Sequence, residues 1–100
     1  KLANESIHFF FKKNLEDNII IKNKNKLILL NKEFFNQPHE IVFRSLTEVI
    51  KIVGKKYYPV RGKKVDKIID RVKNDRIFKS TLGNCIIKKV NETIMVSKEH

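Results

Sequence analysis

The chain has few of the residue types on which several kinds of fold and site depend. Its 100 residues include one cysteine, two prolines, three glycines and no tryptophan. The single cysteine, Cys85, excludes an internal disulfide and a zinc site built from several cysteines, a usage typical of cytoplasmic proteins. Because no Gly/Ser-rich or Pro-rich linker divides the chain, we expect one small folded unit.

The few glycines and histidines do not show the spacings that catalytic motifs require. Gly54, Gly62 and Gly83 fit neither a P-loop nor the dinucleotide-binding fingerprint. His8, His39 and His100 are far apart and have no partners at ligand spacing. We therefore expect no catalytic residue, no metal site and no cofactor within this chain.

Long apolar runs are also missing. No stretch approaches the roughly 20 residues that cross a bilayer. The short run Phe9–Phe11 between polar flanks does not form a signal peptide. We expect no membrane segment and a cytoplasmic location. The chain begins with Lys1 rather than Met, and Glu99-His100 fits a tag remnant, so we expect a fragment of a longer protein.

Positive charge, in contrast, is abundant. The formal net charge is +11 and the pI is about 9.9, which favours nucleic acid first and an anionic membrane surface second. Lys outnumbers Arg 18 to 4, however, and an AT-rich genome imposes such a bias on any protein. The places where the charges cluster are therefore more informative than their sum.

Two stretches have the periodicity of amphipathic helices. Apolar residues recur at helical spacing from Pro38 to about Val53, and Gly54 is expected to end this helix. The range 63–74 repeats the pattern, so the two apolar faces are expected to pack together. We also expect a short helix over 2–13 and a helical turn, capped by Asn31, through residue 35.

Two further regions predict β-hairpins. The polar residues 22–26 separate two apolar triplets, and strands over 81–90 and 93–96 flank Asn91-Glu92, with a bend or bulge at Gly83-Asn84. The predicted fold class is α+β, with two packed helices and a short N-terminal helix flanked by two β-hairpins. We expect a single module over 1–100, with sub-units 1–37 (helix and hairpin) and 38–100 (helix-loop-helix-hairpin).

The segment between the two helices, 54–64, combines five cations with two tyrosines. Regularly spaced cations contact phosphates, and exposed tyrosines stack on unpaired bases, so the segment favours RNA. Lys64, Lys67 and Arg71 extend it along one helix face, unless Lys67 simply pairs with Asp70. The predicted RNA-binding residues are Lys55, Lys56, Tyr57, Tyr58, Arg61, Lys63, Lys64, Lys67 and Arg71.

Two other interpretations stay open. In the first, the segment is ordinary solvated surface with Tyr57 or Tyr58 packed in the core, and the chain is a protein-interaction or structural module. In the second, the chain is a small nuclease-like enzyme, which lacks support because no set of carboxylates and histidines is present. Binding to tRNA across a salt series separates the RNA interpretation from the first alternative.

The order of sequence features over residues 18–98 resembles that of the C-terminal, substrate-recognition part of bacterial tRNA(Ile)-lysidine synthases. A strand is followed by a helix bearing an Arg, then a Gly, a basic loop with a Pro, a second helix, and a Leu-Gly turn before a terminal hairpin. The corresponding segments here are Ile28–Leu30, Phe43–Leu46, Gly54, Pro59 with Arg61, the ridge Val65/Ile68/Ile69, Leu82-Gly83 and Thr93–Val96.

The resemblance implies a larger parent enzyme. That ligase would use ATP, Mg and lysine to convert the wobble cytidine of tRNA(Ile) to lysidine, and the parent would form a homodimer. The family's Ser-Gly-Gly-x-Asp-Ser phosphate loop has no match in this sequence. The resemblance therefore implies that this chain binds tRNA, while the fragment alone is inactive.

Overall fold

The computed structural model describes residues 4–55 and 60–99. Helices and one antiparallel sheet occur together without regular alternation, so the predicted α+β class is confirmed. The helical elements are α1 (Asn4–Asp17), the 3-10 helix η1 (Lys32–Asn36), α2 (His39–Gly54) and α3 (Gly62–Asn74). The strands are β1 (Ile19–Lys22), β2 (Leu27–Leu30), β3 (Ile77–Leu82), β4 (Cys85–Val90) and β5 (Thr93–Lys98).

All five strands belong to one antiparallel sheet in the order β1-β2-β5-β4-β3. The two expected hairpins are present as β1–β2 and β4–β5. Pairing of β2 with β5, in which Leu30 lies opposite Ile94, joins them edge to edge into a single sheet. The hairpins therefore form one side of the core together instead of flanking it separately.

The sequence did not predict β3 in full. This strand begins at Ile77, four residues before the expected start at Thr81. It is an edge strand in which only Phe78 is buried, so its sequence lacks the alternation that identifies a half-buried strand. Gly83 and Asn84, both with positive φ, form the turn between β3 and β4 rather than a bulge within one strand.

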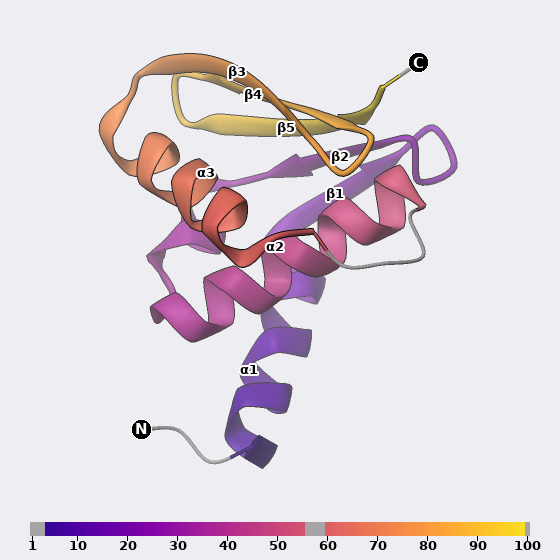
Figure 1. Cartoon of the computed structure of the whole chain (residues 1–100). Coiled ribbons are helices and arrows are strands. Elements are labelled where there is room, and N and C mark those ends of the chain that lie inside the picture. The colour runs from indigo at the N-terminus through magenta and orange to yellow at the C-terminus, as the bar shows by residue number, and fades with distance from the viewer. Residues whose placement is uncertain (1–3, 56–59, 100) are drawn as a thin grey trace.

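Helices α2 and α3 cover the same face of the sheet (Figure 1). Both predicted apolar ridges are buried, and they pack on inward-facing strand residues, as expected. The inward residues of the sheet include Ile28, Leu30, Ile87, Ile94 and Val96. In the described part of the chain no helix lies on the opposite face of the sheet.

Helix α1 runs away from the sheet and extends to Asp17, beyond the predicted end at residue 13. Its last turns have a tertiary partner that periodicity does not reveal. Asn14 is buried, and its Nδ2 donates to the Ser45 hydroxyl at 3.1 Å and to the Phe34 carbonyl at 3.2 Å. These bonds fix α1 to α2 and to η1.

Candidate nucleic-acid interface

The predicted RNA-binding residues fall at the end of α2 and along α3. Lys55 closes α2 in a left-handed conformation (φ 55°), and its N–H donates to the Lys51 carbonyl at 2.9 Å. Gly54 is the last residue of α2, so the helix ends at the predicted residue, and the left-handed C-cap is Lys55. Lys56, Tyr57 and Tyr58 lie outside the described residues.

Helix α3 has a charged outer surface over its buried ridge. Lys63, Lys64, Lys67 and Arg71 are all exposed. Positions 64, 67 and 71 share one side because they follow at i, i+3 and i+7. At the C-terminal end of this side the helix meets β3, since the Arg71 guanidinium lies 4.6 Å from the centre of the Phe78 ring.

The acidic residues of α3 lie on its other side, toward α2. Asp66 Oδ1 lies 3.0 Å from His39 Nε2, although this buried oxygen receives no hydrogen bond among the described residues. No carboxylate of the described chain comes within 4.0 Å of the ammonium of Lys63, Lys64 or Lys67. These three lysines therefore keep their charge available for a partner.

Arg71 differs from the three lysines. Its Nε donates to Asp75 Oδ2 at 3.1 Å while its guanidinium covers Phe78. Both contacts are made within the fold and connect the last turn of α3 to the start of β3. The side chain is exposed, yet much of its interaction capacity is already used by these contacts.

The first turn of α3 concentrates positive potential. It contains Lys63 and Lys64 and no acidic residue, and the preceding Arg61 makes no side-chain cap. The N-terminal end of a helix already carries a partial positive charge, so lysines there destabilise the helix slightly and attract anions. This arrangement opposes helix stability and suits a phosphate contact.

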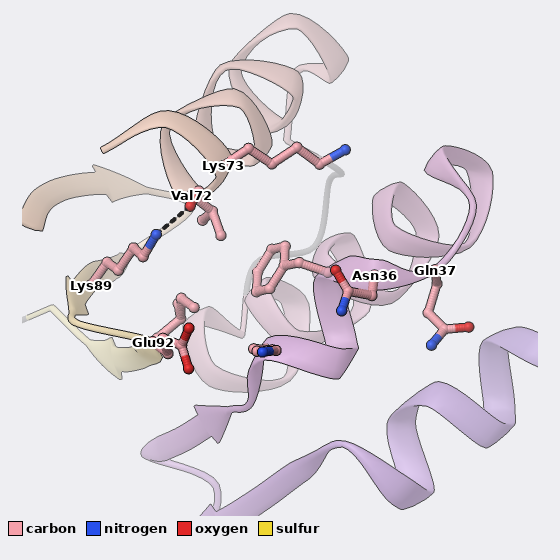
Figure 2. Close-up of a pocket in the computed structure, with 9 residues that line it drawn as sticks. Asn36, Gln37, Val72, Lys73, Lys89 and Glu92 are labelled. Carbon is pink, nitrogen blue, oxygen red and sulfur yellow. Dashed lines mark hydrogen bonds between the residues drawn. The ribbon is translucent and has the colours of Figure 1, made fainter. Parts of the chain in front are cut away.

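Sequence reasoning missed a hollow at the opposite end of α3 (Figure 2). It is open to solvent and has a volume of about 440 Å³ between η1, the last turn of α3 and the β4–β5 turn. Lys32, Lys73 and Lys89 line it together with Asn36, Gln37 and Glu92. These residues come from three separate segments, so no sequence spacing could have indicated that they meet.

One further mark of the resemblance has a packing role. The Arg44 guanidinium lies 5.8 Å from the centre of the Phe11 ring, so it contributes to the contact between α2 and α1. No group of three or more His, Cys, Asp or Glu side chains gathers within residues 4–55 and 60–99. None of the helices in those ranges has the length and apolar content needed to cross a bilayer.

Cys85 is a free, buried cysteine. Burial and, to a lesser degree, the Glu99 carboxylate raise the pKa of the Cys85 thiol to about 11, against a smaller opposing effect of Lys98. The thiol also donates to the Ile50 carbonyl at 3.3 Å. It therefore stays protonated at neutral pH, which makes it a poor nucleophile.

Comparison with known proteins adds one relative. A tRNA(Ile)-lysidine synthase from Wolbachia sp. subsp. Brugia malayi (strain TRS) is 32% identical over 68 residues. The chain is partially related to tRNA(Ile)-lysidine synthase. The match covers 67% of this chain and 16% of the synthase, so the resemblance is supported without assignment to a particular domain of that enzyme. No family model and no solved structure matches the chain.

Proposed function

We propose that the chain is the tRNA-binding, C-terminal part of a tRNA(Ile)-lysidine synthase. The observation that carries the proposal is the set of exposed ammonium groups of Lys63, Lys64 and Lys67, which have no carboxylate within 4.0 Å in the described chain. The partial relationship to a tRNA-modifying enzyme supports tRNA as the polyanion. The conversion of cytidine to lysidine, with its ATP, Mg and lysine, belongs in this proposal to another part of the parent enzyme.

Phosphate contacts are the role proposed for these cations. Each lysine that neutralises a phosphate releases a counterion, so affinity falls as salt rises. Lys55 and Arg61 extend the surface at the end of α2 and the start of α3. Tyr57 and Tyr58 are proposed to stack on bases, and Lys56 to contact phosphate.

The test is fluorescence anisotropy of labelled tRNA(Ile) over a salt series. Changing Lys63, Lys64 and Lys67 together to Ala should weaken binding and reduce the slope of log K against log salt by about one unit per lysine. The matched control changes three exposed lysines to Ala: Lys12 on α1, and the cross-strand pair Lys79 and Lys88 on the sheet face opposite the helices. An equal loss in both variants, or an unchanged slope, contradicts the proposal.

A protein-interaction module is the second candidate, because one sheet face lacks a helical cover in the described chain. On that face Ile20, 58% exposed, pairs with Leu29, which in turn lies opposite Met95. Such a cross-strand apolar row suits a protein partner. Absence of salt-dependent tRNA affinity, together with a concentration-dependent mass in solution, would favour this alternative.

A further inference from the structure

A hydrogen bond between two of its walls holds the hollow at the C-terminal end of α3 together. Lys89, half-buried, donates its ammonium to the carbonyl of Val72 in the last turn of α3 (Figure 2). This bond satisfies one of the carbonyls that a helix end leaves free and fixes α3 to β4. The charge of Lys89 is therefore committed to the fold, and the walls of the hollow are held in place without a ligand.

Two other ammonium groups remain for an anion. Lys32 and Lys73 are exposed, line the hollow, and have no carboxylate within 4.0 Å in the described chain. They come from η1 and α3, so they approach the same space from two elements. Either ammonium group can contact a phosphate at the edge of the hollow.

The remaining polar groups present acceptors. The amide of Asn36 donates to Glu33 Oε1 at 3.4 Å and that of Gln37 donates to the Glu33 carbonyl at 3.0 Å. Their Oδ1 and Oε1 atoms receive no hydrogen bond from any described residue, and the Glu92 carboxylate has no ion-pair partner there. Figure 2 shows Asn36 on the side of the hollow facing Glu92.

We propose that this hollow binds one unpaired nucleotide of an RNA, with the phosphate at Lys32 or Lys73 and the amino edge of the base at Asn36 or Glu92. The volume of about 440 Å³ lies within the range of small-ligand sites, and the buried Phe35 forms part of the wall. Bases with an exocyclic amino group donate to such acceptors. Uracil has no exocyclic amino group and offers these acceptors only its N3–H, between two carbonyl oxygens, so cytidine, adenosine and guanosine are preferred over uridine.

An acidic peptide fits less well, because carboxylates that met the two lysines would also approach Glu92. The inference rests on the proposed function, since it assumes that the chain binds RNA. It adds a base-reading contact at the far end of α3 from Lys63 and Lys64. Because recognition of single-stranded RNA commonly uses extruded bases, the hollow assigns an unpaired end or loop of the tRNA to this part of the surface.

The test uses labelled RNA hairpins with one common stem, either blunt or extended by a short 3′ overhang of cytidines or of uridines. We expect the cytidine overhang to raise affinity roughly tenfold over the blunt stem and the uridine overhang to give much less. Changing Lys32 and Lys73 together to Ala should remove this gain while leaving affinity for the blunt stem nearly unchanged. Glu92→Gln should reduce the discrimination between cytidine and uridine.

The matched control changes Lys79 and Lys88 to Ala, a cross-strand pair that removes the same charge from the opposite sheet face. Circular dichroism verifies that each variant is folded. Salt-dependent binding with equal affinity for blunt and extended stems overturns the proposed nucleotide site in the hollow and leaves the proposed function intact. A gain that survives in the Lys32/Lys73 variant, or binding of an acidic peptide in preference to the overhang, likewise overturns it. Absence of any RNA affinity overturns both.

Discussion

Gly54, the last residue of α2, packs directly on the carbonyl of Gly83 in the β3–β4 turn. A Cβ atom on Gly54 would lie 1.9 Å from the Gly83 oxygen, a distance that no side chain can occupy. Gly83 itself has φ +58° and is enclosed by Ile50 and Val60. The start of the basic segment is thus fixed to the sheet by two glycines in contact, both of which are marks of the family resemblance.

Gly54→Ala should therefore destabilise the protein strongly. The new methyl group must displace backbone, and we expect a loss of about 2 to 3 kcal/mol in the free energy of unfolding. Urea denaturation followed by circular dichroism measures the change. Gly62→Ala is the control, because its Cβ would only touch Phe43 at 3.4 Å. Unchanged stability of Gly54→Ala would contradict the prediction, because it would show that the β3–β4 turn shifts to accommodate the methyl group at little cost.

Lys55→Gly should separate stability from RNA binding. A left-handed lysine is strained by roughly 1 kcal/mol, and glycine removes that strain, so the free energy of unfolding should rise by about this amount. RNA affinity should fall because one cation is lost. Lys55→Ala is the comparison: it should lose the same affinity without gaining stability. If both variants bind RNA as the parent chain does, Lys55 does not belong to the interface.

Asn14→Ala should weaken the attachment of α1. The substitution leaves the Ser45 hydroxyl and the Phe34 carbonyl without their shared donor in a buried place, which costs about 1 to 3 kcal/mol. A double-mutant cycle with Ser45→Ala measures the coupling of the pair by urea denaturation. Asn36→Ala, at an exposed position, should change stability by less than about 0.5 kcal/mol. Absence of coupling would contradict the shared bond.

Cys85 should make folding sensitive to alkaline pH. The folded thiol has a pKa of about 11 against an ordinary value of 9.0, so the native state keeps its proton after the unfolded chain has lost it. Stability should therefore decline as pH rises from 9 to 11. The Cys85→Ala variant should lack this part of the decline. Alkylation by iodoacetamide at pH 8 should be far slower in native than in urea-unfolded protein, and equal rates would contradict burial.

The sequence predicted the elements that local periodicity specifies, namely the two amphipathic helices and the first hairpin. The ridge of α3 and the ridge of α2 repeat at helical spacing, and a polar turn between apolar triplets marked the β1–β2 hairpin. It did not predict the pairing of β2 with β5, because two strands that are distant in the chain can pair without producing any local sequence pattern. Nor could it predict the end of α1, which depends on the contacts of Asn14 with other elements.

The candidate interface shows the same division. Helical spacing grouped Lys64, Lys67 and Arg71 in advance, and the structure places all three at the surface. The engagement of Arg71 with Phe78 depends on where β3 packs, which the sequence does not state. The hollow beside Lys32 and Lys73 exists only once η1, α3 and the β4–β5 turn have met.

The position of β5 between β2 and β4 has a consequence for synthesis on the ribosome. The central strand of the sheet follows the other four strands in the chain, so β1 and β2 wait as an isolated hairpin, which is marginally stable in water. Their partner residues, such as Ile94, emerge only after β3 and β4. A stop codon before Thr93 would therefore remove the middle of the sheet, and the nascent chain would expose the inward-facing apolar residues of β2 until β5 has emerged.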